Sequence, residues 1–226
     1  MFMQYINSPS IVKELGRAKG VSRKDYWKSK HQVGYELSRR FGAIAAAGDR
    51  HLAEFVPWFL TERDSCLKWG FALTPYSYRI SRFNKTPKDY AKILRSGKYP
   101  EIYSSGEEYI NQMLAVLGKA TFVTNVNLPN RGQHLGLPLG AVVETNAVFA
   151  AGGATPVNSG ALPEGVNTLV YRHVVNQETL IKAVSEKNEA LAFRAFLNDA
   201  LVSRLSADTA WKLFKAMVKK TNFNFK

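Results

Sequence analysis

The stretch TNVNLPNRGQHLGLPLGAVVETNAVF, residues 124–149, contains the pattern that decides the fold. Residues 121–127 alternate in polarity and are rich in β-branched side chains, which predicts a β-strand. Residues 141–149 are predicted to form a second strand. The segment between them, NLPNRGQHLGLPLG, is rich in Pro, Gly and Asn, so it must turn tightly. The sequence therefore predicts a small sheet built around this turn.

Helical periodicity flanks the predicted sheet on both sides. Residues 23–47 carry apolar side chains at intervals of three, four and seven, and Gly48 is expected to end this helix. These apolar positions are Tyr26, Val33, Leu37, Phe41 and Ile44. A second helix is expected over residues 50–60, with a break around Pro57. Terminal helices are expected over residues 177–203 and 207–220.

The region between the second helix and the sheet is less regular. Residues 64–86 are aromatic and contain Pro75 and several turn residues, which indicates a long ordered loop of the kind that often lines a site. We expect Thr86-Pro87 to open a short helix that ends near Leu94, and Ser105-Gly106-Glu107 to open another. Helices, then a small sheet, then helices are typical of the α+β class.

The composition is that of a globular protein with ample material for a core: 226 residues, 46% hydrophobic, net charge +13. The apolar runs are too short to cross a bilayer, and residues 1–20 lack the compact apolar run of a signal peptide. The single cysteine, Cys66, excludes an intramolecular disulfide and fits a reducing cytoplasm. Because the basic residues are spread along the chain, we expect neither nucleic acid nor membrane as a partner, and the charge leaves room for an anionic sugar substrate.

Three segments are together similar to a known family. They are AAAGDRHLAEFVPWFL at 45–60, the stretch at 124–149, and EALAFRAFLNDALV at 189–202. Within the second segment the matching residues are Val126-Asn127-Leu128-Pro129-Asn130-Arg131-Gly132, then Leu137-Pro138, then Val142-Val143-Glu144. Over residues 20–205 the chain resembles the C-terminal part of glycoside hydrolase family 4. The segment GDRHLAEF is most similar to the α-galacturonidase and α-glucosidase-like branch of this family. The family also includes 6-phospho-glucosidases.

The resemblance implies both a fold and a chemistry. The implied fold is like the C-terminal domain of lactate and malate dehydrogenases, with helices packed on a small, mostly antiparallel sheet. The implied chemistry cleaves O-glycosidic bonds by oxidation and elimination, and it departs from the two-carboxylate mechanism of most glycosidases. NAD⁺ oxidises the sugar at C3, and a divalent metal, usually Mn²⁺, polarises the C2 and C3 oxygens. The substrate would be a small carbohydrate, for example an anionic sugar such as an α-galacturonide.

The same resemblance implies that this chain is only part of such an enzyme. In the family, the nucleotide-binding domain and a metal-binding cysteine both lie upstream of the region matched here. The sequence has no Gly-x-Gly-x-x-Gly after a strand and no P-loop, and Cys66 follows His51, so Cys66 is expected to be structural. We therefore expect residues 1–226 to be a single C-terminal substrate and catalytic domain that lacks the N-terminal nucleotide-binding domain and is inactive alone.

The resemblance also implies roles for individual residues. His51 matches the metal-binding histidine of the family, whereas without the resemblance it would be read as a core residue. The base would come from the start of the helix before the first strand, where Tyr109 and Glu107 are the candidates. The structural alternative is that Glu107 favours the positive end of that helix and Tyr109 packs.

Substrate-binding candidates lie in the turn and in the aromatic region. Asn130 and Arg131 are placed to reach substrate hydroxyls, and the alternative for Asn130 is to shape the turn. Arg79 is a candidate for holding an anionic sugar group, with simple solvation as its alternative. The remaining three histidines are expected to have no catalytic role. His31 is expected on an exposed helix, His134 at an incidental position and His173 in a surface segment.

Other functions compete with the glycosidase fragment. The chain could be a non-catalytic assembly or binding domain that pairs with itself or with a separate nucleotide-binding chain, and a homo-oligomer is expected because a missing domain would leave apolar surface exposed. A dehydrogenase-like oxidoreductase and a basic nucleic-acid binder are the remaining alternatives. The Asn-x-Gly, Leu-Pro and Val-Val-Glu run argues against the dehydrogenase.

Overall fold

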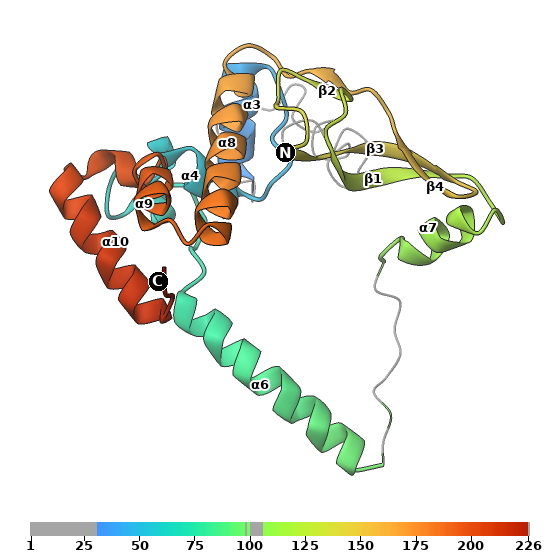
Figure 1. Cartoon of the computed structure of the whole chain (residues 1–226), viewed down its shortest axis with the longest axis horizontal. Helices are drawn as coiled ribbons and strands as arrows, with labels where there is room; N and C mark the ends of the chain where they lie inside the picture. The colour runs from blue at the N-terminus through green and yellow to red at the C-terminus, as the bar shows by residue number, and fades with distance from the viewer. Residues whose placement is uncertain (1–30, 98, 100–105, 226) are drawn as a thin grey trace.

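The computed structural model describes residues 31–97, 99 and 106–225, and within them the expected α+β architecture is confirmed (Figure 1). The α-helices are α3 (Gln32–Phe41), α4 (Asp49–Phe55), α5 (Ser65–Lys68), α6 (Tyr76–Arg95), α7 (Tyr109–Val116), α8 (Val166–Ser185), α9 (Glu189–Leu197) and α10 (Ala207–Thr221). Two 3₁₀ turns, η1 (Pro57–Phe59) and η2 (Val202–Arg204), complete the helical elements. Among the described residues, no helix is long and apolar enough to cross a membrane.

The sheet forms where the sequence predicts it. Strand β1 (Phe122–Pro129) pairs antiparallel with β3 (Val142–Ala150) along its whole length, from Phe122 opposite Phe149 to Pro129 opposite Val142. Strand β4 (Gly153–Pro156) pairs antiparallel with the other edge of β3. Two short strands, β2 (His134–Leu135) and β5 (Gly160–Ala161), form a separate parallel pair. The strand predictions for residues 121–127 and 141–149 are thus confirmed.

The main core lies between the helices α3, α4 and α8. Leu37 of α3, Leu52 of α4 and Val166 of α8 are almost completely buried there, and Val143 of β3 joins the same cluster. A second, smaller cluster lies under the sheet, where Ala115 of α7 packs near the buried face of β3. The sheet is therefore attached to the helical part through one face of its central strand.

The first predicted helix ends earlier than expected. Helix α3 stops at Phe41, because Gly42 adopts a left-handed conformation (φ 66°) and donates its N–H to the Ser38 carbonyl. The prediction that the helix continues to Gly48 is wrong, and residues 23–30 lie outside the described part. The second predicted helix is confirmed as α4 followed by η1, with the break at Pro57.

The predicted loop at residues 64–86 is also wrong, because α5 and α6 occupy most of it. Helix α6 runs through Pro87, which was expected to start a helix rather than lie inside one. Proline has no N–H and cannot donate to the carbonyl four residues earlier, which is the reason it usually marks a helix start. The carbonyl left without this donor is that of Phe83, and the Thr86 hydroxyl instead donates to the Arg82 carbonyl at 2.9 Å.

The C-terminal helices are confirmed in number but not in their limits. Helix α8 begins at Val166, well before the expected start, and Ser206 caps α10 by accepting the N–H of Thr209. Ala183, Ala192 and Phe214 form the core of this end. His173 was expected in a surface segment but lies on α8, half-buried, where its ring contacts Phe55 edge-on and Nε2 lies 2.9 Å from the Phe55 carbonyl oxygen.

The stability of α3 should depend on pH through Glu36. Arg39 donates two hydrogen bonds to this buried carboxylate, and Arg40 donates another. The hydrogen bonds and charges of the two arginines lower the pKa of Glu36 from 4.5 to about 2, although burial alone would raise it. Since the folded pKa is the lower one, the stabilisation is present above pH 4.5 and lost as the pH falls towards 2. We expect Glu36→Gln to lower the free energy of unfolding at neutral pH, because the charge that pairs with both arginines is removed. The loss should be only about 1–2 kcal/mol, because solvent screens both arginines.

Urea unfolding of the wild-type chain and Glu36→Gln at a series of pH values tests this. The difference between the two chains should shrink as the pH falls below 4.5. A difference that stays constant down to pH 3 would contradict the proposed ion pairs.

Candidate functional site

His51 lies on α4 at the surface between the main core and α6. Its Nδ1 is 3.2 Å from Glu54 Oε2, and its Nε2 is 3.4 Å from the Arg50 Nε. A carboxylate beside one ring nitrogen is the usual arrangement that orients a metal-binding histidine and leaves the other nitrogen to the metal. The half-exposed position does not fit a core residue, and the Glu54 contact suits a ligand. Since Nε2 accepts the Arg50 Nε–H in this structure, Arg50 would have to move before a metal could bind there, and the ligand role of His51 stays a prediction.

The position of α4 is fixed by its first residue. Asp49 is buried, and its two carboxylate oxygens accept the N–H groups of Val33 and Gly34, each at 3.0 Å. These are free N–H groups of the first turn of α3, whose own N-cap, His31, makes no capping hydrogen bond with its side chain. Burial raises the pKa of Asp49, and the two N–H donors oppose that shift. The Gly-Asp-Arg turn therefore joins α4 to α3 and holds His51 in place.

Arg50 lies beside His51, and the sequence analysis did not identify it as a candidate site residue. Arg50 is exposed and donates to the Thr74 hydroxyl at 2.5 Å, which ties α4 to the segment before α6. The pKa of Tyr78, on the first turn of α6, is lowered by a hydrogen bond from Arg82 and, more weakly, by the charges of Arg82 and Arg50. Arg50 stands next to His51 in the GDRH segment, which was the signal that could have identified it.

The donor atoms around His51 do not make a complete metal site. Within residues 31–97, 99 and 106–225, no group of three or more His, Cys, Asp and Glu side chains is arranged to hold a metal ion. Mn²⁺ takes several oxygen and nitrogen ligands. The described residues therefore offer one oriented imidazole, and the remaining ligands of such a site would have to come from elsewhere.

The predicted substrate-binding turn is built around Asn130. The Asn130 side chain is 2% exposed, and its Nδ2 lies within hydrogen-bonding distance of the carbonyls of His134, Leu137 and Pro138. Its Oδ1 accepts the N–H groups of Gly132 and His134. These contacts favour the turn-forming alternative for Asn130, and its contact with substrate stays a prediction.

The neighbours of Asn130 divide between solvent and interior. Arg131 is exposed on the turn and free to reach outwards. His134, which was expected to be incidental, is buried, and burial lowers its pKa, so the neutral imidazole is favoured there. Gln133 adds to the turn by donating to the Pro129 carbonyl and accepting the Arg131 N–H.

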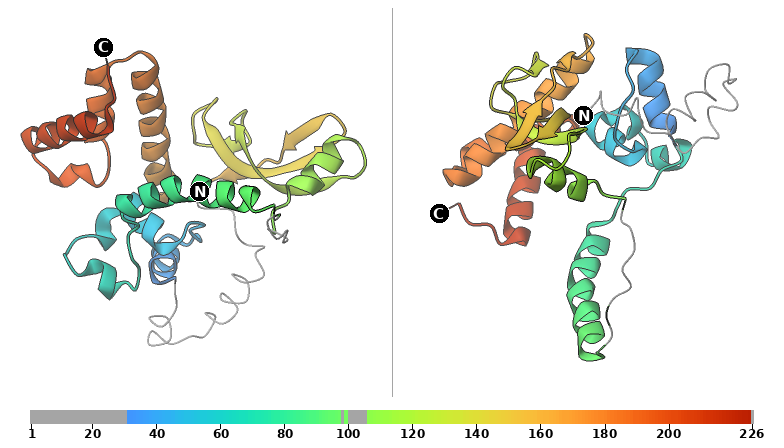
Figure 2. Two further views of the ribbon diagram at one scale, coloured as in Figure 1. Left: turned by 90° about the horizontal axis from the view of Figure 1, so that it is seen from below. Right: turned by 90° about the vertical axis from the view of Figure 1, so that its right-hand side faces the viewer.

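The predicted base residues lie on or just before α7, at the end of the sheet that is far from α4 (Figure 1). Tyr109 is the first residue of α7, so the helix starts later than the expected Ser105-Gly106-Glu107, of which Ser105 lies outside the described residues. Glu107 and Tyr109 are both exposed, and Glu108 forms a hydrogen bond with the Thr124 hydroxyl of β1. Helices α4 and α7 are well separated, with α7 beyond the sheet and α4 among the helices (Figure 1 and the left-hand view of Figure 2).

The structure therefore brings together only part of the predicted site. His51, Glu54 and Arg50 form one group, and Arg79 lies on α6, exposed, close to the Tyr78 and Arg82 pair in the chain. Helix α7, which begins at Tyr109 directly after Glu107 and Glu108, lies apart from α4 (Figure 1), so the predicted bases are not part of this group. Arg131 lies on the turn that follows β1. Their catalytic and substrate-binding roles stay predictions.

Comparison with known proteins gives a consistent result. The model of the family 4 glycosyl hydrolase C-terminal domain matches residues 5–202. An α-galacturonidase from Thermoanaerobacterium saccharolyticum is 48% identical over 196 residues, which are 85% of this chain and 42% of that protein. An α-galacturonidase from Thermoanaerobacter italicus is 44% identical over 201 residues, 88% of this chain and 44% of that protein. The chain thus spans less than half the length of the curated relatives it matches.

Solved structures show the same relation. The structure named as the glucosidase LplD of Bacillus subtilis superposes with a TM-score of 0.78 at 39% identity, over 92% of this chain and 49% of that one. A 6-phospho-α-glucosidase from gut microorganisms, in complex with NAD and Mn²⁺, has a TM-score of 0.61 at 17% identity, over 94% of this chain and 48% of that one, and shows the fold alone. The chain therefore belongs to family 4 of the glycosyl hydrolases, whose C-terminal domain it carries.

Proposed function

We propose that this chain is the C-terminal half of a glycosidase that cleaves O-glycosidic bonds by an NAD- and metal-dependent oxidation and elimination, and that it is inactive on its own. The observation that carries the proposal is its identity of 42–48% to three α-galacturonidases over most of its length. The oriented imidazole of His51 supports a role in metal binding. The remaining metal ligands and the NAD site would be supplied from outside the described residues.

The proposed substrate is an anionic sugar such as an α-galacturonide. The charge of Arg50 beside His51 supports this choice, because an arginine guanidinium matches a carboxylate in geometry and charge. Arg79, Arg131 and Asn130 are the further proposed substrate contacts, and Tyr109 and Glu107 the proposed bases.

Calorimetric titration of the purified chain with NAD⁺ in the presence of Mn²⁺ is the first test, and we expect no binding at micromolar NAD⁺. In the second step the chain is mixed with the separately expressed nucleotide-binding half of a related α-galacturonidase, and release of 4-nitrophenol from 4-nitrophenyl α-galacturonide is followed. We expect cleavage only in the mixture, and loss of at least about 100-fold in rate in His51→Ala, as for loss of a group that positions a catalytic metal. His31→Ala, an exposed histidine before α3, is the matched control.

Micromolar binding of NAD⁺ to the chain alone would contradict the proposal that its cofactor site is incomplete. Equal rates for His51→Ala and His31→Ala in an active mixture would contradict the metal-binding role of His51.

The second candidate is a non-catalytic assembly domain that pairs with itself or with a separate nucleotide-binding chain. It is favoured by a specific observation: no residue of α6 is buried, and several of its apolar side chains are exposed. The mixing experiment separates the two candidates, because an assembly domain would bind its partner without producing 4-nitrophenol.

A further inference from the structure

Two arginines, Arg50 of α4 and Arg82 of α6, carry charges that no acidic side chain balances. In the part of the chain that the structure describes, no ion pair joins either guanidinium to a carboxylate. The acidic residues of α4 are engaged elsewhere, since Asp49 accepts N–H groups of α3 and Glu54 contacts His51. Both arginines therefore keep their positive charge available to a ligand.

Both guanidiniums are oriented by hydroxyl groups rather than by carboxylates. Arg50 donates from Nη1 to the Thr74 hydroxyl at 2.5 Å, and Arg82 donates from Nη1 to the Tyr78 hydroxyl at 3.5 Å. A side chain that is oriented before its ligand arrives loses less conformational entropy on binding. The two hydroxyl groups thus orient the arginines without neutralising them.

The two arginines belong to one group beside His51. Their partners Thr74 and Tyr78 lie four residues apart, just before and on the first turn of α6. The pKa of Tyr78 is lowered by the hydrogen bond from Arg82 and then by the charges of Arg82 and Arg50, so both charges act at the same phenol. The Nε of Arg50 lies 3.4 Å from Nε2 of His51, which places the group next to the proposed metal ligand.

The chemistry of this group suits a carboxylate. A guanidinium presents its N–H donors in a planar fork that matches the two oxygens of a carboxylate, and the contacts to His51 and Thr74 leave most donors of Arg50 for a ligand. A phosphate would meet the same fork, so charge and shape alone admit either oxyanion. The relatives named α-galacturonidases favour the carboxylate.

We propose that Arg50 and Arg82, oriented by Thr74 and Tyr78, form the site that recognises the carboxylate of a sugar acid and so determine the specificity of the enzyme. This inference rests on the proposed glycosidase function and assigns one part of its site. The sugar ring would extend from the carboxylate on Arg50 towards His51, which Arg50 contacts.

The other two proposed arginine contacts are not oriented in this way. Arg79 and Arg131 are exposed, and neither guanidinium has a hydrogen-bond or ion-pair partner among the described residues. We therefore expect Arg79→Lys and Arg131→Lys to weaken recognition of a sugar acid less than Arg50→Lys does.

NMR titration of the ¹⁵N-labelled chain at constant ionic strength tests the site directly, because each arginine Nε–H signal reports on one guanidinium. The probes are galacturonate, galactose and galactose 6-phosphate. Arg50→Lys and Arg82→Lys assign the two signals, and they remove the fork while keeping the charge. We expect galacturonate to shift both signals and galactose to shift neither. Either substitution should raise the dissociation constant for galacturonate at least about tenfold.

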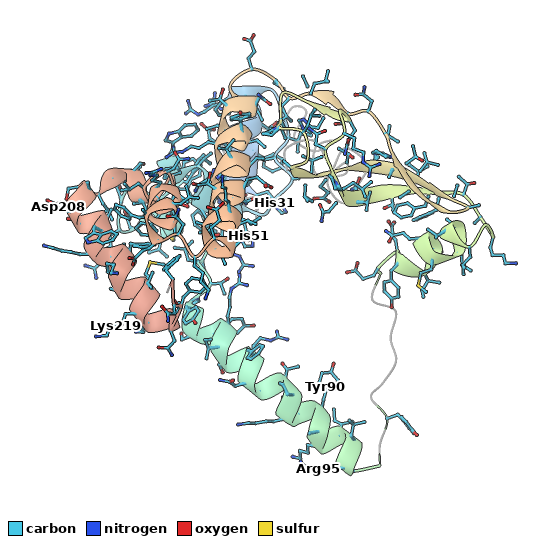
Figure 3. The ribbon with its side chains drawn as sticks, viewed as in Figure 1. His31, His51, Tyr90, Arg95, Asp208 and Lys219 are labelled. Carbon is cyan, nitrogen blue, oxygen red and sulfur yellow. The ribbon has the colours of Figure 1, made fainter. Side chains whose placement is uncertain are left out.

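Arg95→Lys is the matched control, because Arg95 is an exposed arginine of the same helix at the end far from His51 (Figure 3). We expect it to leave the binding of galacturonate unchanged. Thr74→Val keeps both arginines but removes the hydroxyl that orients Arg50, so it should weaken binding by a smaller factor than Arg50→Lys. Circular dichroism melts show that each variant is folded.

Kinetics of the mixed enzyme described above test the role in specificity. Arg82 makes no contact with His51 in this structure, so its effect can be separated from an effect on the proposed metal ligand. We expect Arg82→Lys to raise KM for 4-nitrophenyl α-galacturonide at least about tenfold with little change in kcat, and Arg95→Lys to change neither.

Several results would overturn the proposal. Equal shifts with galactose and galacturonate, or unchanged binding in both Arg50→Lys and Arg82→Lys, would exclude a carboxylate site here. Tighter binding of galactose 6-phosphate than of galacturonate would show that the group recognises a sugar phosphate instead. Loss of binding only in Arg79→Lys or Arg131→Lys would assign the carboxylate to that arginine. If the titration gives the expected result but the mixed enzyme cleaves no galacturonide, the proposed glycosidase activity is wrong and the carboxylate site stands.

Discussion

Replacing Asn130 with alanine is expected to lower the free energy of unfolding by about 3–5 kcal/mol, because it leaves several buried backbone groups without partners. The side chain of Asn130 contacts three carbonyl oxygens through Nδ2 and accepts two N–H groups through Oδ1. With the backbone bonds from Asn130 to Ala141 and from Gly140 to Asn130, it closes the turn on which β1 and β3 meet. Urea unfolding followed by circular dichroism measures the loss.

The chemistry of the Asn130 side chain can be separated from its size. Asn130→Asp has the same shape, but at neutral pH it would point a carboxylate oxygen at the carbonyls that Nδ2 now faces, so we expect a loss at least as large as for alanine. Asn158→Ala is the matched control, since Asn158 makes a similar local bond to the Gly160 N–H at an exposed position, and we expect it to cost less than about 1 kcal/mol. Equal losses for Asn130→Ala and Asn158→Ala would show that the turn is held by other contacts.

The sheet could be predicted from the sequence because its signals are local. Alternation over a few residues identifies each strand, and a run of Pro, Gly and Asn between two strands forces a turn. Hence β1 and β3 are found within one or two residues of their predicted limits. The identity of the residue that closes the turn is less local, but Asn130 stood out because asparagine accepts and donates to the backbone around it.

The helices were predicted less well where a single residue or a distant partner decides where the helix begins or ends. The left-handed Gly42 ends α3 while the apolar spacing continues to Ile44, so periodicity alone gave the wrong end. In α6, Pro75 and Pro87 suggested breaks, although the apolar side chains from Tyr76 to Leu94 keep helical spacing. This spacing is visible in the sequence and was outweighed by a general rule about proline.

Of the candidate site, the sequence pointed only to the histidine, and its metal-binding role stays a prediction. His51 was identified by family resemblance, and its neighbours Arg50 and Glu54 are within three residues in the chain. The distance between α4 and α7 could not be predicted, since it depends on how the sheet and α8 separate them.

We expect Asp49→Ala to lower the free energy of unfolding by about 2–4 kcal/mol and to disturb the position of His51, the proposed metal ligand. The two N–H groups of Val33 and Gly34 would lose the buried carboxylate that accepts them, which combines the loss of a helix cap with two unsatisfied donors. The sequence gives no sign of this contact, because Asp49 lies 16 residues from Val33 and 15 from Gly34. Urea unfolding gives the stability, and the rate of 4-nitrophenol release in the mixed enzyme at a temperature where the variant is folded gives the effect on the site.

Two further variants show which property of Asp49 matters. Asp49→Asn keeps one oxygen acceptor and removes the charge whose burial raises the pKa of Asp49, so we expect it to lose about half as much as alanine. Asp208→Ala is the matched control, because Asp208 is an exposed acidic residue in the first turn of α10 that interacts mainly with the helix dipole, at about 0.5 kcal/mol. If Asp49→Ala costs no more than Asp208→Ala, the link from α3 to α4 does not stabilise the fold. If stability falls as expected but the mixed enzyme keeps its rate, His51 is held by the Arg50 and Glu54 contacts alone.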